Sequence, residues 1–176
     1  MKTLLFFVFL PCLWANVSVE LFYETLCPDS QAFIKGPLAD LIREPDILSR
    51  VELTLVPFGN GKVDGNAITC QHGAEECKSN TIQNCALTAA CHDSAKQCFP
   101  FIHCMEKAMG HSSSAAPCAS QHNIDNNVIE QCVKEKGVDL LRAAHAKTAA
   151  VSGKRYVPWV LVNGKHLDCP HGTCDL

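Results

Sequence analysis

Apolar and polar residues alternate near the start of the chain, where Val17, Val19 and Leu21 are separated by Ser18 and Glu20. This period of two predicts a β-strand over residues 17–23. Apolar residues then follow at helical spacing over residues 33–42, with a kink or new helix start expected where Gly36 meets Pro37. A second apolar run at residues 51–57 completes a strand–helix–strand pattern, which is typical of the parallel crossover unit of an α/β fold.

The pattern changes to helical over residues 66–150 and returns to strand at residues 157–162. Three helical segments are expected in between, and their apolar members are Phe99, Ile102, Met105 and Met109; Ile124, Val128, Cys132 and Val133; and an Ala-rich stretch at residues 138–148. Residues 112–117 are predicted to form a loop, and Asn163-Gly164 predicts a hairpin turn before residues 165–167. The order predicts an α/β, thioredoxin-like fold with a helical, disulfide-rich insertion at about residues 66–150.

The first 15 residues have the features of a signal peptide. Lys2 precedes an apolar stretch at residues 4–13, which is too short for a comfortable membrane span, and Ala15 is the small residue expected before cleavage. Residues 16–176 are then expected to form a single thioredoxin-like domain without a membrane span. Asn16-Val17-Ser18 is a candidate N-glycosylation site. The net charge of −3 and the lack of a basic run argue against a nucleic-acid partner.

Twelve cysteines predict a disulfide framework formed in an oxidising compartment. Cleavage after residue 15 would remove Cys12 and leave an odd number, so one cysteine must remain unpaired within the chain. Cysteine–histidine neighbours such as Cys91-His92 allow zinc as an alternative, but paired Cys-x-x-Cys knuckles are missing and we expect no metal. The expected structural disulfides involve Cys70, Cys77, Cys85, Cys91, Cys98, Cys104, Cys118, Cys132, Cys169 and Cys174, with Cys169–Cys174 as the most local pair.

Cys27 is the expected unpaired cysteine, because it lies where the first strand gives way to a helix that begins at Pro28. Free N–H groups at a helix N-terminus stabilise a thiolate, whereas the neighbouring Asp29 opposes it. Pro158 opens the late strand and is expected to form a cis-proline loop beside this cysteine. The backbone at Val157 would then pair with an extended substrate.

The segment Cys70-Gln71-His72-Gly73-Ala74-Glu75-Glu76-Cys77-Lys78-Ser79-Asn80-Thr81-Ile82-Gln83-Asn84-Cys85 resembles the signature of the gamma-interferon-inducible lysosomal thiol reductase family. The pattern is CQHG, two residues, EC, two residues, N, four residues and C, and every fixed position is met. The resemblance implies a thioredoxin-like enzyme that reduces disulfides of unfolded proteins in acidic endocytic compartments. Signature residues His72 and Glu76 receive no role from the sequence, and His72 is interpreted as a surface histidine.

The family's catalytic pair is a Cys-x-x-Cys at residues 27–30, and here Ser30 stands in place of the second cysteine. Cys27 can form a mixed disulfide with a substrate, but a serine cannot resolve it. Turnover would need an external thiol such as cysteine or glutathione, or a second thiol of the substrate. No bound cofactor is expected. The alternatives are a non-catalytic protein that binds or traps unfolded chains and a disulfide-rich helical lipid-binding protein, which the strands disfavour. A secreted or a lysosomal location would suit the leader.

Overall fold

The structure, a computed structural model, describes residues 16–176, so the predicted signal peptide at residues 1–15 lies outside the described part of the chain. No helix within residues 16–176 is long and apolar enough to cross a membrane. The elements in chain order are β1 (Val17–Tyr23), α1 (Pro28–Lys35), α2 (Pro37–Arg43), α3 (Pro45–Leu48), β2 (Val51–Pro57), β3 (Lys62–Asp64), β4 (Ala67–Thr69), α4 (Ala74–Cys85), η1 (Ala86–Ala90), α5 (Ala95–Lys107), η2 (Ser112–Ser114), α6 (Ala115–Gln121), α7 (Asn126–Ala149), β5 (Trp159–Val162), β6 (Lys165–Leu167) and η3 (Pro170–Gly172).

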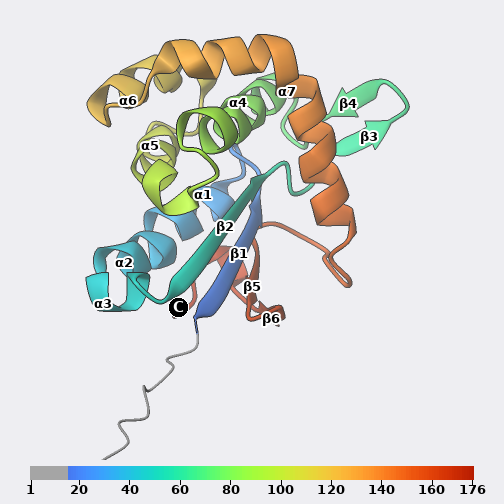
Figure 1. Cartoon of the computed structure of the whole chain (residues 1–176). Helices are drawn as coiled ribbons and strands as arrows, with labels where there is room; N and C mark the ends of the chain where they lie inside the picture. Colours follow the sequence, from blue (N-terminus) through green and yellow to red (C-terminus); the bar gives the residue numbers. More distant parts are fainter. Residues whose placement is uncertain (1–15) are drawn as a thin grey trace, which may run out of the picture.

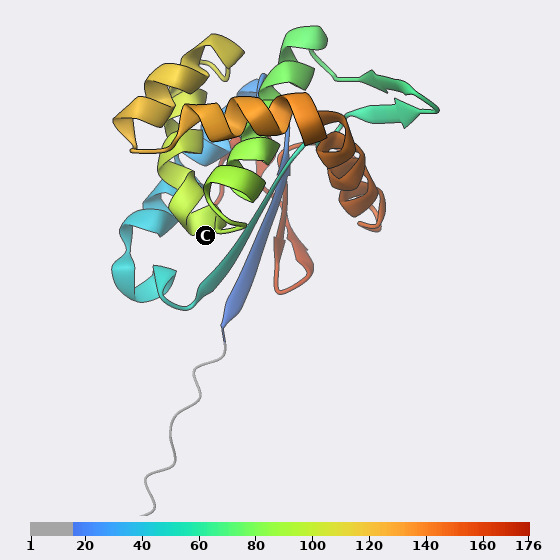
Figure 2. The ribbon, with the colours of Figure 1, turned by 45° about the horizontal axis from the view of Figure 1, so that its top comes forward.

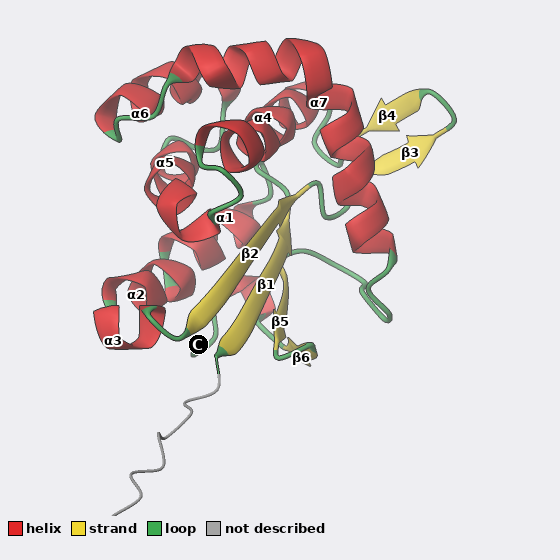
Figure 3. Cartoon of the chain, in the orientation of Figure 1, coloured by secondary structure: helices red, strands yellow, loops and turns green. Residues whose placement is uncertain are grey.

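A four-stranded sheet in the order β2-β1-β5-β6 forms the centre of the fold (Figures 1 and 3). β1 pairs in parallel with β2 over its whole length, and in antiparallel orientation with β5. The turn at Asn163-Gly164 joins β5 to β6 with both residues at positive φ, as the hairpin signal predicted. The sheet and the inserted helices confirm the expected thioredoxin-like fold class.

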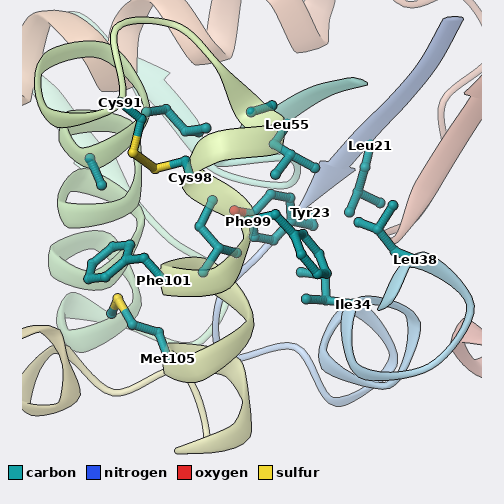
Figure 4. Packing of buried hydrophobic residues seen from close by; sticks show 14 of the residues in the cluster. Leu21, Tyr23, Ile34, Leu38, Leu55, Cys91, Cys98, Phe99, Phe101 and Met105 are labelled. Atoms are coloured by element: carbon teal, nitrogen blue, oxygen red, sulfur yellow. A yellow bond between two sulfur atoms is a disulfide. The ribbon is translucent and has the colours of Figure 1, made fainter. Parts of the chain in front are cut away.

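One face of the sheet packs against α1, α2 and α5. Leu21 and Tyr23 project from β1 onto Ile34 and Leu38, and Phe101 is part of the same buried cluster (Figure 4). These side chains are all fully buried, and α1 and α2 meet at Gly36-Pro37, where the sequence predicted a kink. This packing fixes the position of α1, and therefore of Cys27 at its beginning, against the end of β1.

The opposite face of the sheet carries a smaller apolar cluster. Phe22, Val56 and Trp159 point away from the first core and pack with Leu141 and Ala144 of α7. Figure 2 shows α7 passing across α4 before its C-terminal half runs down beside the sheet. Helices therefore cover both faces of the central strand pair.

The inserted region ends at Ala149, close to the expected residue 150, but differs from the prediction at its start and within its last helix. Residues 62–69 form the two-stranded hairpin β3–β4, so the helices begin at Ala74 and not near residue 66. The two helices expected within residues 124–148 are one continuous helix of 24 residues, α7. Gly137 does not end this helix, because it lies where α7 meets α4, and an added Cβ would be 2.6 Å from Cγ2 of Thr81.

Other details of the helical prediction were wrong for local reasons. The loop expected over residues 112–117 is instead η2 followed by α6, which tolerates Pro117 because a first-turn N–H has no helical partner. Met109 is exposed, since α5 ends at Lys107 and the chain turns there with Gly110 at a φ of +69°. Val128, a member of the second predicted apolar stripe, is exposed on α7.

Five disulfides join the ten cysteines that the sequence assigned to a structural framework. They are Cys70–Cys77, Cys85–Cys132, Cys91–Cys98, Cys104–Cys118 and Cys169–Cys174. Four of them lie within the inserted helical region or at its edge. The Cys91–Cys98 bridge borders the main core near Phe99 and Leu55 (Figure 4).

Candidate active site around Cys27

Cys27 is the free cysteine of the described residues, and it occupies the position directly before α1. Its backbone is extended, and its carbonyl accepts the first helical hydrogen bond from the Gln31 N–H at 3.0 Å. Pro28 follows at the first helical position, where its missing N–H has no consequence. The residue is 6% exposed, so the thiol lies just below the protein surface.

The peptide bond between Val157 and Pro158 is cis, and its loop lies against Cys27. The Cys27 Sγ is 3.8 Å from the Val157 carbonyl oxygen, so residues 130 positions apart in the sequence meet here. A pocket of about 290 Å³ adjoins this contact, lined in part by Asp29, Pro158 and His171. The structure thus brings together Cys27 and Pro158, as the sequence predicted.

Ser30, at the position of the family's second cysteine, is fully buried. Its Oγ lies 3.4 Å from the backbone nitrogen of Glu24 and accepts a hydrogen bond from that N–H group. The hydroxyl therefore binds the backbone at the end of β1. A hydroxyl cannot exchange with a disulfide, and this hydrogen bond links α1 to the loop that leads to Cys27.

Glu24 is a buried carboxyl group that the sequence did not single out. It accepts hydrogen bonds from the Asn60 backbone N–H at 2.7 Å and from the Asn80 side-chain amide at 2.5 Å. Burial, and then the nearby carboxylate of Glu76, raise the pKa of Glu24 to about 7, although both amide donors oppose the shift. The loop before Cys27 therefore encloses a carboxyl group that titrates near neutrality.

The polar residues of the sequence signature surround this carboxyl group. Glu76 is fully buried and accepts hydrogen bonds from the N–H groups of Leu26 (3.2 Å) and His72 (2.7 Å). His72 is exposed, as expected of a surface histidine, and its Nδ1 lies 2.7 Å from Glu76 Oε1. Gln71 accepts a hydrogen bond from the Asn60 side chain at 2.8 Å. The i, i+4 spacing of Glu76 and Asn80 was the available sequence signal for a shared helix face.

An aromatic group flanks the cis-proline loop on its other side. The rings of Trp159 and His166 are stacked with their centroids 3.6 Å apart, and the Tyr156 ring meets both edge-on. The Tyr156 hydroxyl donates to Asp168 at 2.6 Å, and this bond is the main cause that raises the Tyr156 pKa. These contacts tie the loop before β5 to the end of β6.

Two further predictions concern a metal site and an N-glycosylation site. Within residues 16–176, no group of three or more His, Cys, Asp or Glu side chains is arranged to hold a metal ion, and Cys91, the cysteine of the possible zinc neighbour pair, is in a disulfide. Asn16 is exposed immediately before β1, where its side-chain amide donates to Glu52 at 3.0 Å. A glycan on Asn16 would replace that hydrogen bond.

A free cysteine at the start of α1, facing a cis-proline loop across a mixed sheet, defines a thioredoxin-like protein. The family model described as gamma interferon inducible lysosomal thiol reductase (GILT) matches residues 18–122, and the chain belongs to this family. It is 34% identical over 155 residues to a gamma-interferon-responsive lysosomal thiol protein of Arabidopsis thaliana, covering 87% of this chain and 64% of that protein. It is 33% identical over 162 residues to the gamma-interferon-inducible lysosomal thiol reductase of Mus musculus, covering 88% and 63%.

The chain thus spans a little under two thirds of the length of these relatives. Among solved structures, Chlamydia trachomatis DsbA is similar with a TM-score of 0.62 at 15% identity, covering 96% of this chain and 89% of that one. MdbA, a thiol-disulfide oxidoreductase from Corynebacterium diphtheriae, is similar with a TM-score of 0.57 at 16% identity, covering 89% and 80%. At such identities, the likeness shows the fold.

Proposed function

We propose that this protein is a thiol–disulfide oxidoreductase that reduces or isomerises disulfides of protein substrates through a mixed disulfide at Cys27. The observation that carries the proposal is the contact between the unpaired Cys27 sulfur and the carbonyl of Val157, next to Pro158. Family membership supports it. A substrate strand that paired with the backbone at Val157 would bring its own disulfide to the Cys27 sulfur.

The first step is the attack of the Cys27 thiolate on one sulfur of the substrate disulfide. A new bond joins Cys27 to that sulfur, the substrate bond breaks, and the departing thiolate takes up a proton. Because Ser30 offers no second thiol, an external thiol such as cysteine or glutathione then attacks the mixed disulfide. Two external thiols become one disulfide for each substrate disulfide reduced, whereas attack by a second substrate thiol gives isomerisation with no net redox change.

A binding or trapping protein is the second candidate, and the buried Ser30 favours it. With no internal group to release the substrate, the mixed disulfide would persist wherever external thiols are scarce. The substrates in either case would be disulfide-containing or unfolded proteins. We also propose that residues 1–15 are a signal peptide, that residues 16–176 act as one domain, and that the protein enters the secretory route toward secretion or a lysosome.

Reduction of insulin at pH 5 and pH 7 with excess cysteine tests the function. Wild type is expected to accelerate reduction, and Cys27→Ala is expected to show only the rate of cysteine alone. Ser30→Cys serves as the comparison that restores a second thiol. Activity in Ser30→Cys alone would favour the trapping protein, and equal rates for wild type and Cys27→Ala under every condition would exclude the enzyme.

A further inference from the structure

The loop between β1 and Cys27 is held by side chains of a different element. The N–H groups of Thr25 and Leu26 donate hydrogen bonds to side chains of α4. The Thr25 N–H donates to the side-chain Oδ1 of Asn80 at 3.1 Å, and the Leu26 N–H donates to the Glu76 carboxylate at 3.2 Å. The turn closes with the N–H of Cys27 donating to the Glu24 carbonyl at 3.2 Å. The N–H groups of the two residues immediately before Cys27 therefore depend on α4 for their hydrogen bonds, while the Thr25 carbonyl accepts from Gln31 of α1 at 2.9 Å.

Glu76 and Asn80 are suited to this task by their spacing and burial. They lie four residues apart, so they share one face of α4, and both are fully buried. Glu76 also receives the N–H of His72, which precedes α4, and lies next to the His72 ring. The side-chain nitrogen of Asn80 donates a hydrogen bond to the Glu24 carboxyl group. Every hydrogen-bonding atom of these two side chains thus contacts the loop or the start of α4.

Buried polar atoms are costly unless they are paired, so the loop and α4 are stable only together. Loss of Asn80 would leave the buried Thr25 N–H group without its partner, and loss of Glu76 would do the same to the half-buried N–H group of Leu26. The loop would then open locally, and the thiol, 6% exposed when closed, would be reached more easily by small reagents. A protein disulfide needs a fixed thiol orientation and would react more slowly.

We propose that Glu76 and Asn80 are positioning residues for Cys27, fixing the backbone of Thr25 and Leu26 so that the thiol is held against the Val157 carbonyl. This inference rests on the proposed function of Cys27. It assigns two fixed polar positions of the signature to the active-site loop, although they lie some fifty residues further along the chain. The histidine of the signature acts with them through Glu76.

The test compares Glu76→Ala, Glu76→Gln and Asn80→Ala with wild type, and uses Lys78→Ala, an exposed substitution on the same helix, as the matched control. Two rates are measured on folded protein, verified by near-UV circular dichroism. They are the alkylation of Cys27 by iodoacetamide and the formation of the mixed disulfide with native, disulfide-bonded insulin. The expected result is opposite changes in the two rates. Alkylation rises about tenfold in both alanine variants, the equivalent of one hydrogen bond, while mixed-disulfide formation falls by a similar factor.

Glu76→Gln separates positioning from simple loss of stability, because its amide oxygen can still accept from Leu26, while the charge is gone and the amide nitrogen cannot accept from the His72 N–H group. Both rates should return to within about threefold of wild type in this variant. The inference is overturned if both alanine variants stay within twofold of wild type, or if both rates rise together. A wild type that forms no mixed disulfide would refute the proposed function, while the alkylation rates would still test the loop. If Glu76→Ala does not fold, Asn80→Ala and Glu76→Gln decide.

Discussion

Glutamine in place of Glu106 removes a buried carboxyl group whose protonation is linked to folding. Glu106 is fully buried on α5, where one oxygen accepts from the Gln83 amide at 2.6 Å. Among the described residues, its other oxygen has no hydrogen-bond partner. Burial is the main cause that raises the pKa of Glu106 from 4.5 to about 8, and the hydrogen bond from Gln83 and the charge of Lys35 oppose it.

The sign of the effect follows from the folded state holding the proton more tightly than the unfolded state. The stability that this proton contributes is complete below about pH 4.5 and is lost as the pH rises toward 8. At about 1.4 kcal/mol per pKa unit, the Glu106 contribution to the free energy of unfolding falls by roughly 2.5 kcal/mol between pH 5 and pH 7. Glu106→Gln keeps the shape and the Gln83 contact, so it removes this loss.

Urea unfolding at pH 5 and at pH 7, followed by circular dichroism, gives the quantity needed. The difference in unfolding free energy between Glu106→Gln and wild type should move by roughly 2.5 kcal/mol in favour of the variant at pH 7. The titration of Glu24 is present in both proteins and cancels. Glu44→Gln, at an exposed position, is the matched control. If the difference in unfolding free energy between Glu106→Gln and wild type is equal at both pH values, protonation of Glu106 is not linked to folding.

Two further predictions concern the inserted helices. Replacing Cys85 and Cys132 together by alanine opens a link across 47 residues and should lower the free energy of unfolding by about 4 kcal/mol, measured by urea unfolding; a loss below 1 kcal/mol would contradict the entropic argument. Gly137→Ala should destabilise by about 1–2 kcal/mol despite the better helix propensity of alanine, because its Cβ would meet the Thr81 methyl group. Thr81→Ser removes that methyl group, so the double variant should regain the lost stability, measured by thermal unfolding. If the double variant stays as unstable as Gly137→Ala, the contact with the Thr81 methyl group is not the cause of the loss.

Local patterns were enough to predict the strands of the central sheet and the position of the thiol, but not the β3–β4 hairpin. The alternation around Leu21 marked β1, Asn163-Gly164 marked the β5–β6 hairpin, and Pro28 marked the start of the helix after Cys27. Each of these signals acts within a few residues of the element that it specifies. The fold class followed from their order along the chain.

The surroundings of the thiol could not be predicted because they depend on tertiary contacts. Glu24 looks like an ordinary polar residue after a strand, and its pKa is raised by its burial in the folded protein and then by the nearby Glu76, while Asn80 opposes the shift. In the same way, Gly137 appears to be a helix breaker until α4 is packed against α7. The signature indicated that residues 70–85 matter together, but not that they hold the loop before Cys27.

Mass spectrometry of the products formed with a disulfide-bonded substrate shows directly whether Cys27 is the reactive thiol. The folded protein is incubated with native, disulfide-bonded insulin without external thiol, and the mixture is quenched with acid and digested. The expected product is a mixed disulfide that joins a substrate cysteine to Cys27 alone, released on addition of cysteine, with the five internal disulfides intact. An insulin adduct on any other cysteine, or a Cys27 that remains an unmodified thiol throughout, would contradict it.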